Sequence, residues 1–213
     1  MPKKATTIVR MESFQNLTPT GRRSATGARK LAMYLAYGRG RGMELAGRDM
    51  RGQWFSQGIR LVSHQSVLDW VLAQGKQQTF THQFILSLKE GQPLSEEYCQ
   101  AMQAGGDLFS NWHLIRHTDA KHSHAHVLAF GQREIRIKDP LFQEWCQKVR
   151  YYLEQMQERW LEQQQALSLK EEITRTIHQE MDQELGLGLS NRLKRQLDKD
   201  LDEELGRGWG MGY

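Results

Sequence analysis

The segment HTDAKHSHAHVLAF, residues 117–130, decides how this chain is interpreted. It contains four of the chain's eight histidines and ends in an apolar run. The apolar and β-branched run predicts a strand over residues 122–130, in which His122, His124 and His126 point to one face. We therefore expect the chemistry of the protein in this segment.

The spacing of these histidines limits what they can bind. Same-face neighbours on a strand lie roughly 7 Å apart, so two adjacent imidazoles can converge on one ion, whereas the outer two, about 13 Å apart, hardly can. Residues 112–117 read as a preceding strand, and the polar turn 118–121 would return His117 beside the pair. Three neutral imidazoles leave metal positions open, which is typical of a catalytic site. The alternative is a solvated, histidine-rich hairpin without function.

The order His-x-Asp-x-x-His-x-His-x-His before an apolar run resembles the third motif of the HUH-type DNA relaxases. These enzymes nick DNA to start plasmid conjugation and mobilisation. The segment is particularly similar to the branch that contains the T-DNA border endonuclease. Relatives in that branch often carry Asn four residues after the last histidine, where this chain has Phe130. A side-chain hydrogen bond near the site is therefore expected to be missing.

Further segments resemble the same family in consistent order over about residues 5 to 160. Residues 28–40, ARKLAMYLAYGRG, resemble the first motif, in which Tyr34 takes the position of the nucleophile. Residues 81–88, THQFILSL, resemble the central strand, and residues 133–140 resemble the strand and helix start after the histidine motif. The resemblance implies an α+β fold, with a central antiparallel sheet flanked by helices and followed by an α-helical C-terminal extension.

The resemblance also implies a mechanism. A divalent ion, Mg²⁺ or Mn²⁺ with Zn²⁺ as a further alternative, would be held by His117, His124 and His126 and would polarise the scissile phosphate. Tyr34 would attack and leave a 5′-phosphotyrosine and a free 3′ hydroxyl. A phenol with a pKa of about 10 is mostly protonated, so a base is needed. Asp119 would be that base or, as we prefer, would orient His117.

Neighbouring residues receive secondary roles. Tyr37 lies one helical turn from Tyr34, so a two-tyrosine mechanism stays open beside a packing role. His122 is a second-choice metal ligand or a phosphate contact, and Ser87 is a candidate DNA contact.

The composition is compatible with a nucleic-acid partner. Lys and Arg number 29 and Asp and Glu 25, a net charge of +4 that alone does not distinguish a DNA-binding protein. Basic residues crowd the first quarter of the chain, as expected of a surface that faces a phosphate backbone. Trp54 and Phe55 could stack on unpaired bases, but core packing is the simpler role. The DNA-contacting cations predicted here are Arg29, Lys30, Arg39 and Arg41.

The domain organisation follows from pattern and punctuation. We predict a catalytic domain over residues 1–140 and, over 141–213, a helical extension with a flexible tail. The extension is expected to hold helices over 142–165, from Ser168 and after the Gly-rich break at 186–190. The core elements expected are strands at 6–11, 80–88, 112–117, 122–130 and near 134–137, and helices at 26–37, at 62–74 and from Ser95.

Compartment and partners complete the prediction. The two cysteines are too few for a disulfide framework, and the N-terminus lacks the apolar stretch of a signal peptide, so we expect a cytoplasmic protein without membrane insertion. The expected partners are single-stranded DNA at a nick site, accessory DNA-binding proteins and a type IV secretion coupling protein. Two alternatives remain: an HUH rolling-circle initiator or transposase, in which the histidine motif usually precedes the tyrosine, and a non-catalytic DNA-binding accessory protein.

Overall fold

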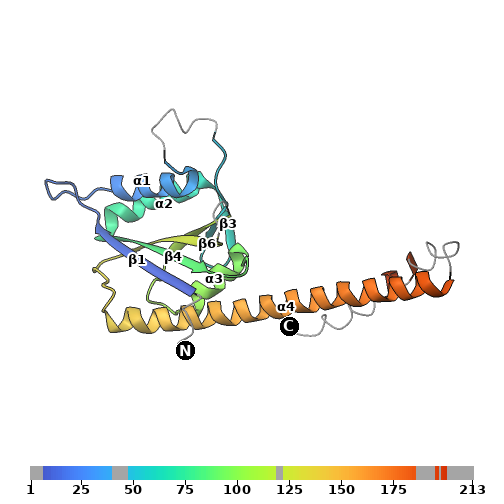
Figure 1. Ribbon diagram of the computed structural model, residues 1–213. Helices are drawn as coiled ribbons and strands as arrows, with labels where there is room; N and C mark the ends of the chain where they lie inside the picture. Colours follow the sequence, from blue (N-terminus) through green and yellow to red (C-terminus); the bar gives the residue numbers. More distant parts are fainter. Residues whose placement is uncertain (1–6, 40–47, 119–121, 186–194, 197, 201–213) are drawn as a thin grey trace. The chain divides into compact units, whose positions relative to one another are not determined.

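The computed structural model describes residues 7–39, 48–118, 122–185, 195–196 and 198–200. The chain divides into two compact units, residues 1–160 and 161–213. The first unit contains all the strands and the first three helices (Figure 1). Helix α4, Pro140–Leu185, begins in the first unit and continues into the second.

The first unit is built on a six-stranded sheet with the order β1-β4-β6-β5-β2-β3. Every neighbouring pair of strands is antiparallel. The predicted α+β class with a central antiparallel sheet is therefore confirmed. The strands are β1 (Thr7–Gln15), β2 (Trp54–Ser56), β3 (Arg60–Val62), β4 (Phe80–Leu88), β5 (Trp112–His117) and β6 (His124–Gly131).

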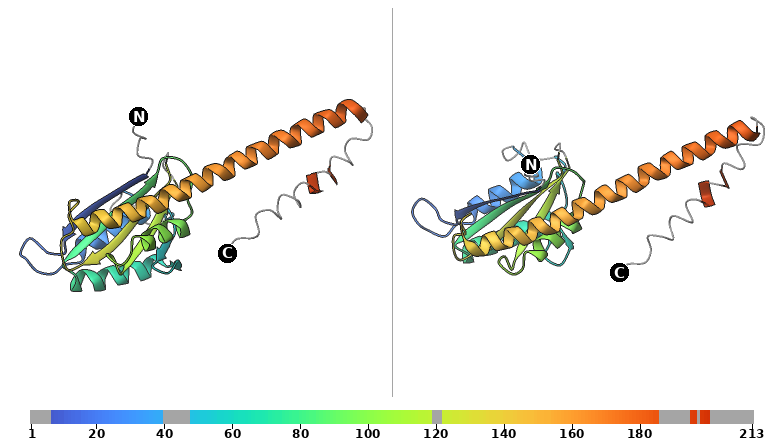
Figure 2. Two further views of the ribbon diagram at one scale, coloured as in Figure 1. Left: turned by 90° about the horizontal axis from the view of Figure 1, so that it is seen from below. Right: turned by 60° about the horizontal axis from the view of Figure 1, so that its bottom comes forward.

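Helices cover both faces of the sheet (Figure 1). Helices α1, Thr26–Tyr37, and α2, His64–Gln77, lie on one face and enclose a core of alanines, aliphatic residues and Trp54. Helix α3, Ser95–Ala104, and the start of α4 lie on the other face over a larger, aromatic-rich core. Figure 2 shows this part of α4 crossing the strands. Because strand residues alternate between faces, each strand contributes to both cores.

Local sequence signals explain where several elements start. Ser63 caps α2, since its hydroxyl accepts a hydrogen bond from the backbone N–H of Ser66. Glu97 in the first turn of α3 accepts from the backbone N–H of Leu94 and faces the positive end of the helix dipole. The boundaries of α1, β4 and β5 coincide with the predicted ones.

Two sequence predictions of secondary structure are wrong. The strand expected near 134–137 is absent, because Ile135 alone turns into the core and the backbone N–H of Asp139 donates to the carbonyl of Arg136 to close a turn. The helix break expected before Ser168 is also absent. Ser168 lies within α4, because no Gly or Pro interrupts residues 141–185 and a capping-type residue does not end a helix by itself.

The short hairpin of β2 and β3 was not predicted from the sequence. It lies at the edge of the sheet, where Trp54 pairs with Ile115 of β5. Trp54 is fully buried and Phe55 is nearly so, which assigns both side chains to packing and not to base stacking. Within the described residues, no helix has the length and apolar character required to cross a bilayer.

Candidate metal centre

The hairpin of β5 and β6 brings together three of the predicted metal ligands. His117 on β5 pairs directly with His124 on β6, and His126 follows two residues later on the same face. The ring centroids of the three imidazoles lie 4.7 to 5.2 Å apart. One nitrogen from each ring can be chosen so that all three lie within 4.8 Å of one another. These three residues, called the histidine triad below, could hold one metal ion.

The tautomer of His117 is set by helix α1. Its Nε2 donates to the backbone carbonyl of Leu35 at 2.7 Å, across 82 residues of sequence. A neutral ring protonated at Nε2 carries its lone pair on Nδ1, the nitrogen then available for a metal. Metal-binding histidines typically donate their other ring N–H to a carbonyl or carboxylate, so this contact fits a ligand.

His124 has a similar arrangement. Its Nδ1 lies 3.1 Å from the carbonyl oxygen of His122 and can donate to it, which leaves the lone pair on Nε2. His124 is half-buried, whereas His117 and His126 are buried. The triad therefore has one side that solvent or a substrate can reach.

Gln83 supplies the contact to His126. The side-chain nitrogen Nε2 of Gln83 lies 3.3 Å from Nδ1 of His126 and donates to it in this orientation, which protonates the ring at Nε2. A flipped amide, with its oxygen toward Nδ1, would accept the ring N–H and leave Nε2 of His126 for a metal. Sequence reasoning missed Gln83. The sequence did carry a signal for it, because Gln83 is a polar residue inside the mostly apolar strand β4. It lies on the sheet face that also carries the histidines of β6.

The donor chemistry of the triad fits a transition metal. Three imidazole nitrogens suit Zn²⁺ and similar borderline metals, whereas Mg²⁺ prefers oxygen ligands. Three protein ligands leave at least one position for water or substrate. The geometry thus supports the predicted capacity of these three histidines to hold a metal ion.

Tyr34 lies on α1, directly before the residue whose carbonyl holds His117. Its side chain is 42% exposed, while Leu35 and Ala36 are fully buried. Tyr37, the second candidate nucleophile, packs edge-on against His64 at 5.2 Å between ring centroids. This contact with His64 assigns Tyr37 a packing role.

The predicted DNA contacts lie on several elements. Arg29 and Lys30 are exposed on α1, and the carbonyl of Arg39 accepts from Arg48. Ser87 lies opposite His124 in the sheet, and its hydroxyl donates to the carbonyl of Ser123. Arg41 and Asp119 lie outside the described residues, so their predicted roles stay predictions.

His122 does not join the triad. It is exposed, and its Nδ1 lies 2.9 Å from the carbonyl oxygen of Lys89. Its predicted role as a phosphate contact stays a prediction.

Two other histidines of the sheet are packing residues. His82 lies against Phe109 and His113 against Trp70, both deep in the cores. Burial lowers the pKa of His113 to about 4, and burial together with the charge of Arg133 lowers the pKa of His82 to about 4. Both rings are therefore neutral at physiological pH.

Comparison with known proteins gives no relative: no protein-family model, curated protein or solved structure matches this chain.

Proposed function

We propose that this protein is a metal-dependent DNA relaxase that nicks one strand at an origin of transfer and attaches itself to the 5′ end through Tyr34. The observation that carries the proposal is the hydrogen bond between His117 and the carbonyl of Leu35. This contact couples the triad to the helix that bears Tyr34, the residue that the motif resemblance implies as the nucleophile. The candidate metal site therefore contacts the helix on which the half-exposed phenol lies.

The bound ion would supply Lewis-acid stabilisation of the charge that develops on the phosphate oxygens. The three histidines would hold the ion, and their contacts to Leu35, His122 and Gln83 restrain the ring orientations. Such preorganisation matters because catalysis depends on donors that are already aligned when charge develops.

The residues of the chain then account for a balanced transesterification. The Tyr34 oxygen forms a bond to phosphorus while the bond from phosphorus to the 3′ oxygen breaks. The phenolic proton is lost, and the 3′ oxygen leaves as a hydroxyl, so no proton is consumed overall. One phosphodiester replaces another, which makes the step reversible without a nucleotide cofactor and allows the same site to rejoin strands.

Cationic residues on α1 suit this role. Arg29 and Lys30 are exposed on the helix that carries Tyr34, and each phosphate they neutralise would release counterions. Accessory DNA-binding proteins and a coupling protein of a secretion channel would present the strand and receive the covalent complex.

A covalent-adduct assay tests the proposal. The protein is incubated with single-stranded fragments that cover the DNA on either side of its own gene, with Mn²⁺ or Zn²⁺, and run on denaturing protein gels. We expect an adduct that disappears on chelation and in Tyr34→Phe. Tyr37→Phe is the matched control, one helical turn away, and should retain the adduct.

Two outcomes would overturn this function. If the wild type binds these strands with metal present but forms no adduct, the protein is better described as a non-catalytic DNA-binding accessory protein. If Tyr37→Phe loses the adduct and Tyr34→Phe keeps it, the nucleophile is misassigned.

A further inference from the structure

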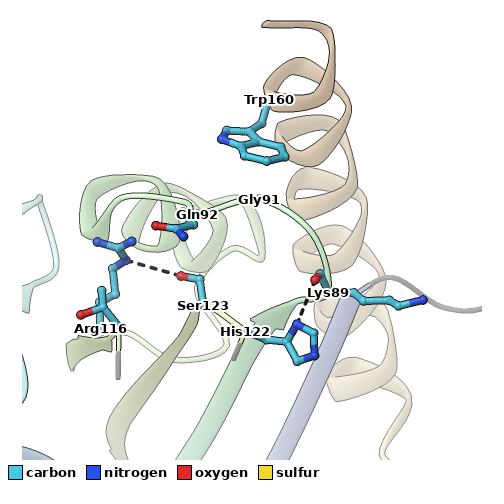
Figure 3. Close-up of a pocket in the computed structure, with 8 residues that line it drawn as sticks. Lys89, Gly91, Gln92, Arg116, His122, Ser123 and Trp160 are labelled. Carbon is cyan, nitrogen blue, oxygen red and sulfur yellow. Dashed lines mark hydrogen bonds between the residues drawn. The ribbon is translucent and has the colours of Figure 1, made fainter. Parts of the chain in front are cut away.

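A second site lies at the same end of the sheet as the triad. It is a cavity of about 200 Å³ at the tip of the β5 and β6 hairpin, beneath the loop that follows β4 (Figure 3). Its volume is below the roughly 300 Å³ of the smallest drug-sized pockets, so it suits a compact group. The residues that matter for its chemistry are Lys89, Gln92, Arg116, His122, Ser123 and Trp160.

The cavity and the triad are placed on opposite faces of one hairpin. Arg116 directly precedes His117, and Ser123 directly precedes His124. Because consecutive strand residues point to opposite faces, the hairpin that directs imidazoles toward α1 directs Arg116 toward α3 and α4. Ala125, the partner of Arg116 in the ladder, belongs to the core on that same face.

The charge of the cavity is cationic. Arg116 lines it and none of its lining residues is acidic. Lys89 lies at the edge of the cavity with its backbone carbonyl near His122, and its side chain points away from the other lining residues in Figure 3. Within the described residues, Arg116 has no carboxylate within the 4.0 Å of a salt bridge. A guanidinium in a small cavity without a carboxylate partner favours an anionic ligand.

Arg116 is held in place from one side. Its Nε donates to the hydroxyl of Ser123 at 3.5 Å, and that hydroxyl also accepts from Tyr98 at 3.3 Å. Burial raises the pKa of Tyr98 to about 12, so the phenol stays a donor. This network engages Nε of Arg116, and the end of the side chain reaches toward Gln92 in Figure 3. A fixed fork of this kind matches the geometry of a phosphate group.

Trp160 adds an aromatic surface. Its indole projects from α4 over the loop at Gly91, where a Cβ would lie 3.5 Å from the ring. Gly91 has a φ of 95°, a conformation that favours glycine, so the shape of this loop under the indole depends on that residue. The ring is half-buried and remains able to stack on a base.

We propose that this cavity binds one phosphate of single-stranded DNA through Arg116, with a neighbouring base on Trp160. The strand would run between the triad and the cavity, and the exposed His122 would contact it on the way. The proposal deepens the relaxase function and rests on it for the choice of ligand, but the binding it describes needs neither nicking nor Tyr34.

The test measures affinity of the full chain, as Tyr34→Phe to prevent attachment, for a fluorescein-labelled oligo(dT) by anisotropy at several salt concentrations. Arg116→Gln should bind about tenfold more weakly, and the slope of log affinity against log salt should shrink by about 0.7, as for one lost single-strand phosphate contact. Trp160→Leu should also lose about tenfold, whereas Trp160→Phe should retain most of the affinity. Lys148→Gln, an exposed cation elsewhere on α4, should change affinity less than twofold.

Three results would overturn the proposal. Unchanged affinity in folded Arg116→Gln and Trp160→Leu removes the cavity from the DNA path, whatever the adduct assay gives. Equal competition by dTMP and by unlabelled oligo(dT) at matched concentration assigns the cavity to a free nucleotide. An equal loss of DNA affinity in Lys148→Gln would show that the effect depends on the overall positive charge and not on the cavity. Thermal melting and metal content of each variant verify that fold and triad are intact, and a missing adduct with these binding losses present would count only against nicking.

Discussion

Two groups of histidines lie in one sheet and differ in what surrounds them. His82 and His113 are buried against aromatic rings, and burial lowers the pKa of each to about 4. The histidine triad consists of rings that face one another, and each has a nitrogen in contact with a carbonyl or an amide. His117 and His126 are as buried as His82 and His113, so burial alone does not identify a ligand. An outer hydrogen bond does not identify one either, since Nδ1 of His82 lies 2.8 Å from the Ser13 hydroxyl. The convergence of three rings is the feature that distinguishes the triad.

The largest effect is expected from a substitution that removes one ligand of the histidine triad. We expect His124→Ala to reduce affinity for Zn²⁺ or Mn²⁺ by more than the roughly 100-fold that loss of an outer contact can cost, because one of three ligands disappears. The matched control is His122→Ala, two residues away on the same hairpin, which should change metal affinity less than twofold. Isothermal titration with each metal measures both. Equal losses in the two variants would assign the metal to another set of residues.

A second expected effect concerns the packing histidines. Because their folded-state pKa of about 4 lies below the ordinary value of 6.5, the unfolded chain binds more protons between these values. Stability is therefore fully present above about pH 6.5 and is lost as pH falls toward 4. Each ring should cost on the order of 2 kcal/mol at pH 5.

Denaturant unfolding at pH 7.5 and pH 5, with chelator present, measures this loss. His113→Phe keeps an aromatic ring beside Trp70 and should remove about half of the loss assigned to the two packing histidines. An unchanged difference between the two pH values in His113→Phe would show that His113 is not the titrating group.

A smaller effect on metal affinity is expected from substitutions of Gln83. These substitutions distinguish the two orientations of its side-chain amide. If Gln83 accepts the Nδ1–H of His126, Gln83→Leu should weaken metal binding about tenfold, and Gln83→Glu, which can only accept when ionised, should keep it. Metal titration of both variants decides. Weak binding in both would indicate that the amide donates to His126 instead.

The smallest effect is expected at Tyr37. Its ring packs against His64 on the helix that carries Tyr34, so Tyr37→Phe should leave metal affinity within twofold and lower stability by less than about 1 kcal/mol. Metal titration and thermal melting measure the two quantities. A large loss of metal affinity in Tyr37→Phe would mean that Tyr37 contributes to the metal site, which would contradict its packing role.

Much of the site could be predicted from local pattern. The period-two alternation of the histidine segment fixes His124 and His126 on one face, and the polar turn before it returns His117 on the adjacent strand. The strand near 134–137 was predicted wrongly because Ile135 is the only buried residue of an irregular turn. A single apolar anchor and a strand look alike in so short a segment.

The hairpin, its three histidines and the α+β class could thus be inferred from local pattern, because strand periodicity and turn composition are local properties. The hydrogen-bond partners of His117 and His126 became evident only from the folded chain. The Leu35 carbonyl and the Gln83 amide come from α1 and β4, and hydrogen bonds between segments so distant in the chain leave no periodic signal. The tertiary structure also placed Trp160 over the loop at Gly91, beside the Arg116 that alternation turns away from the triad.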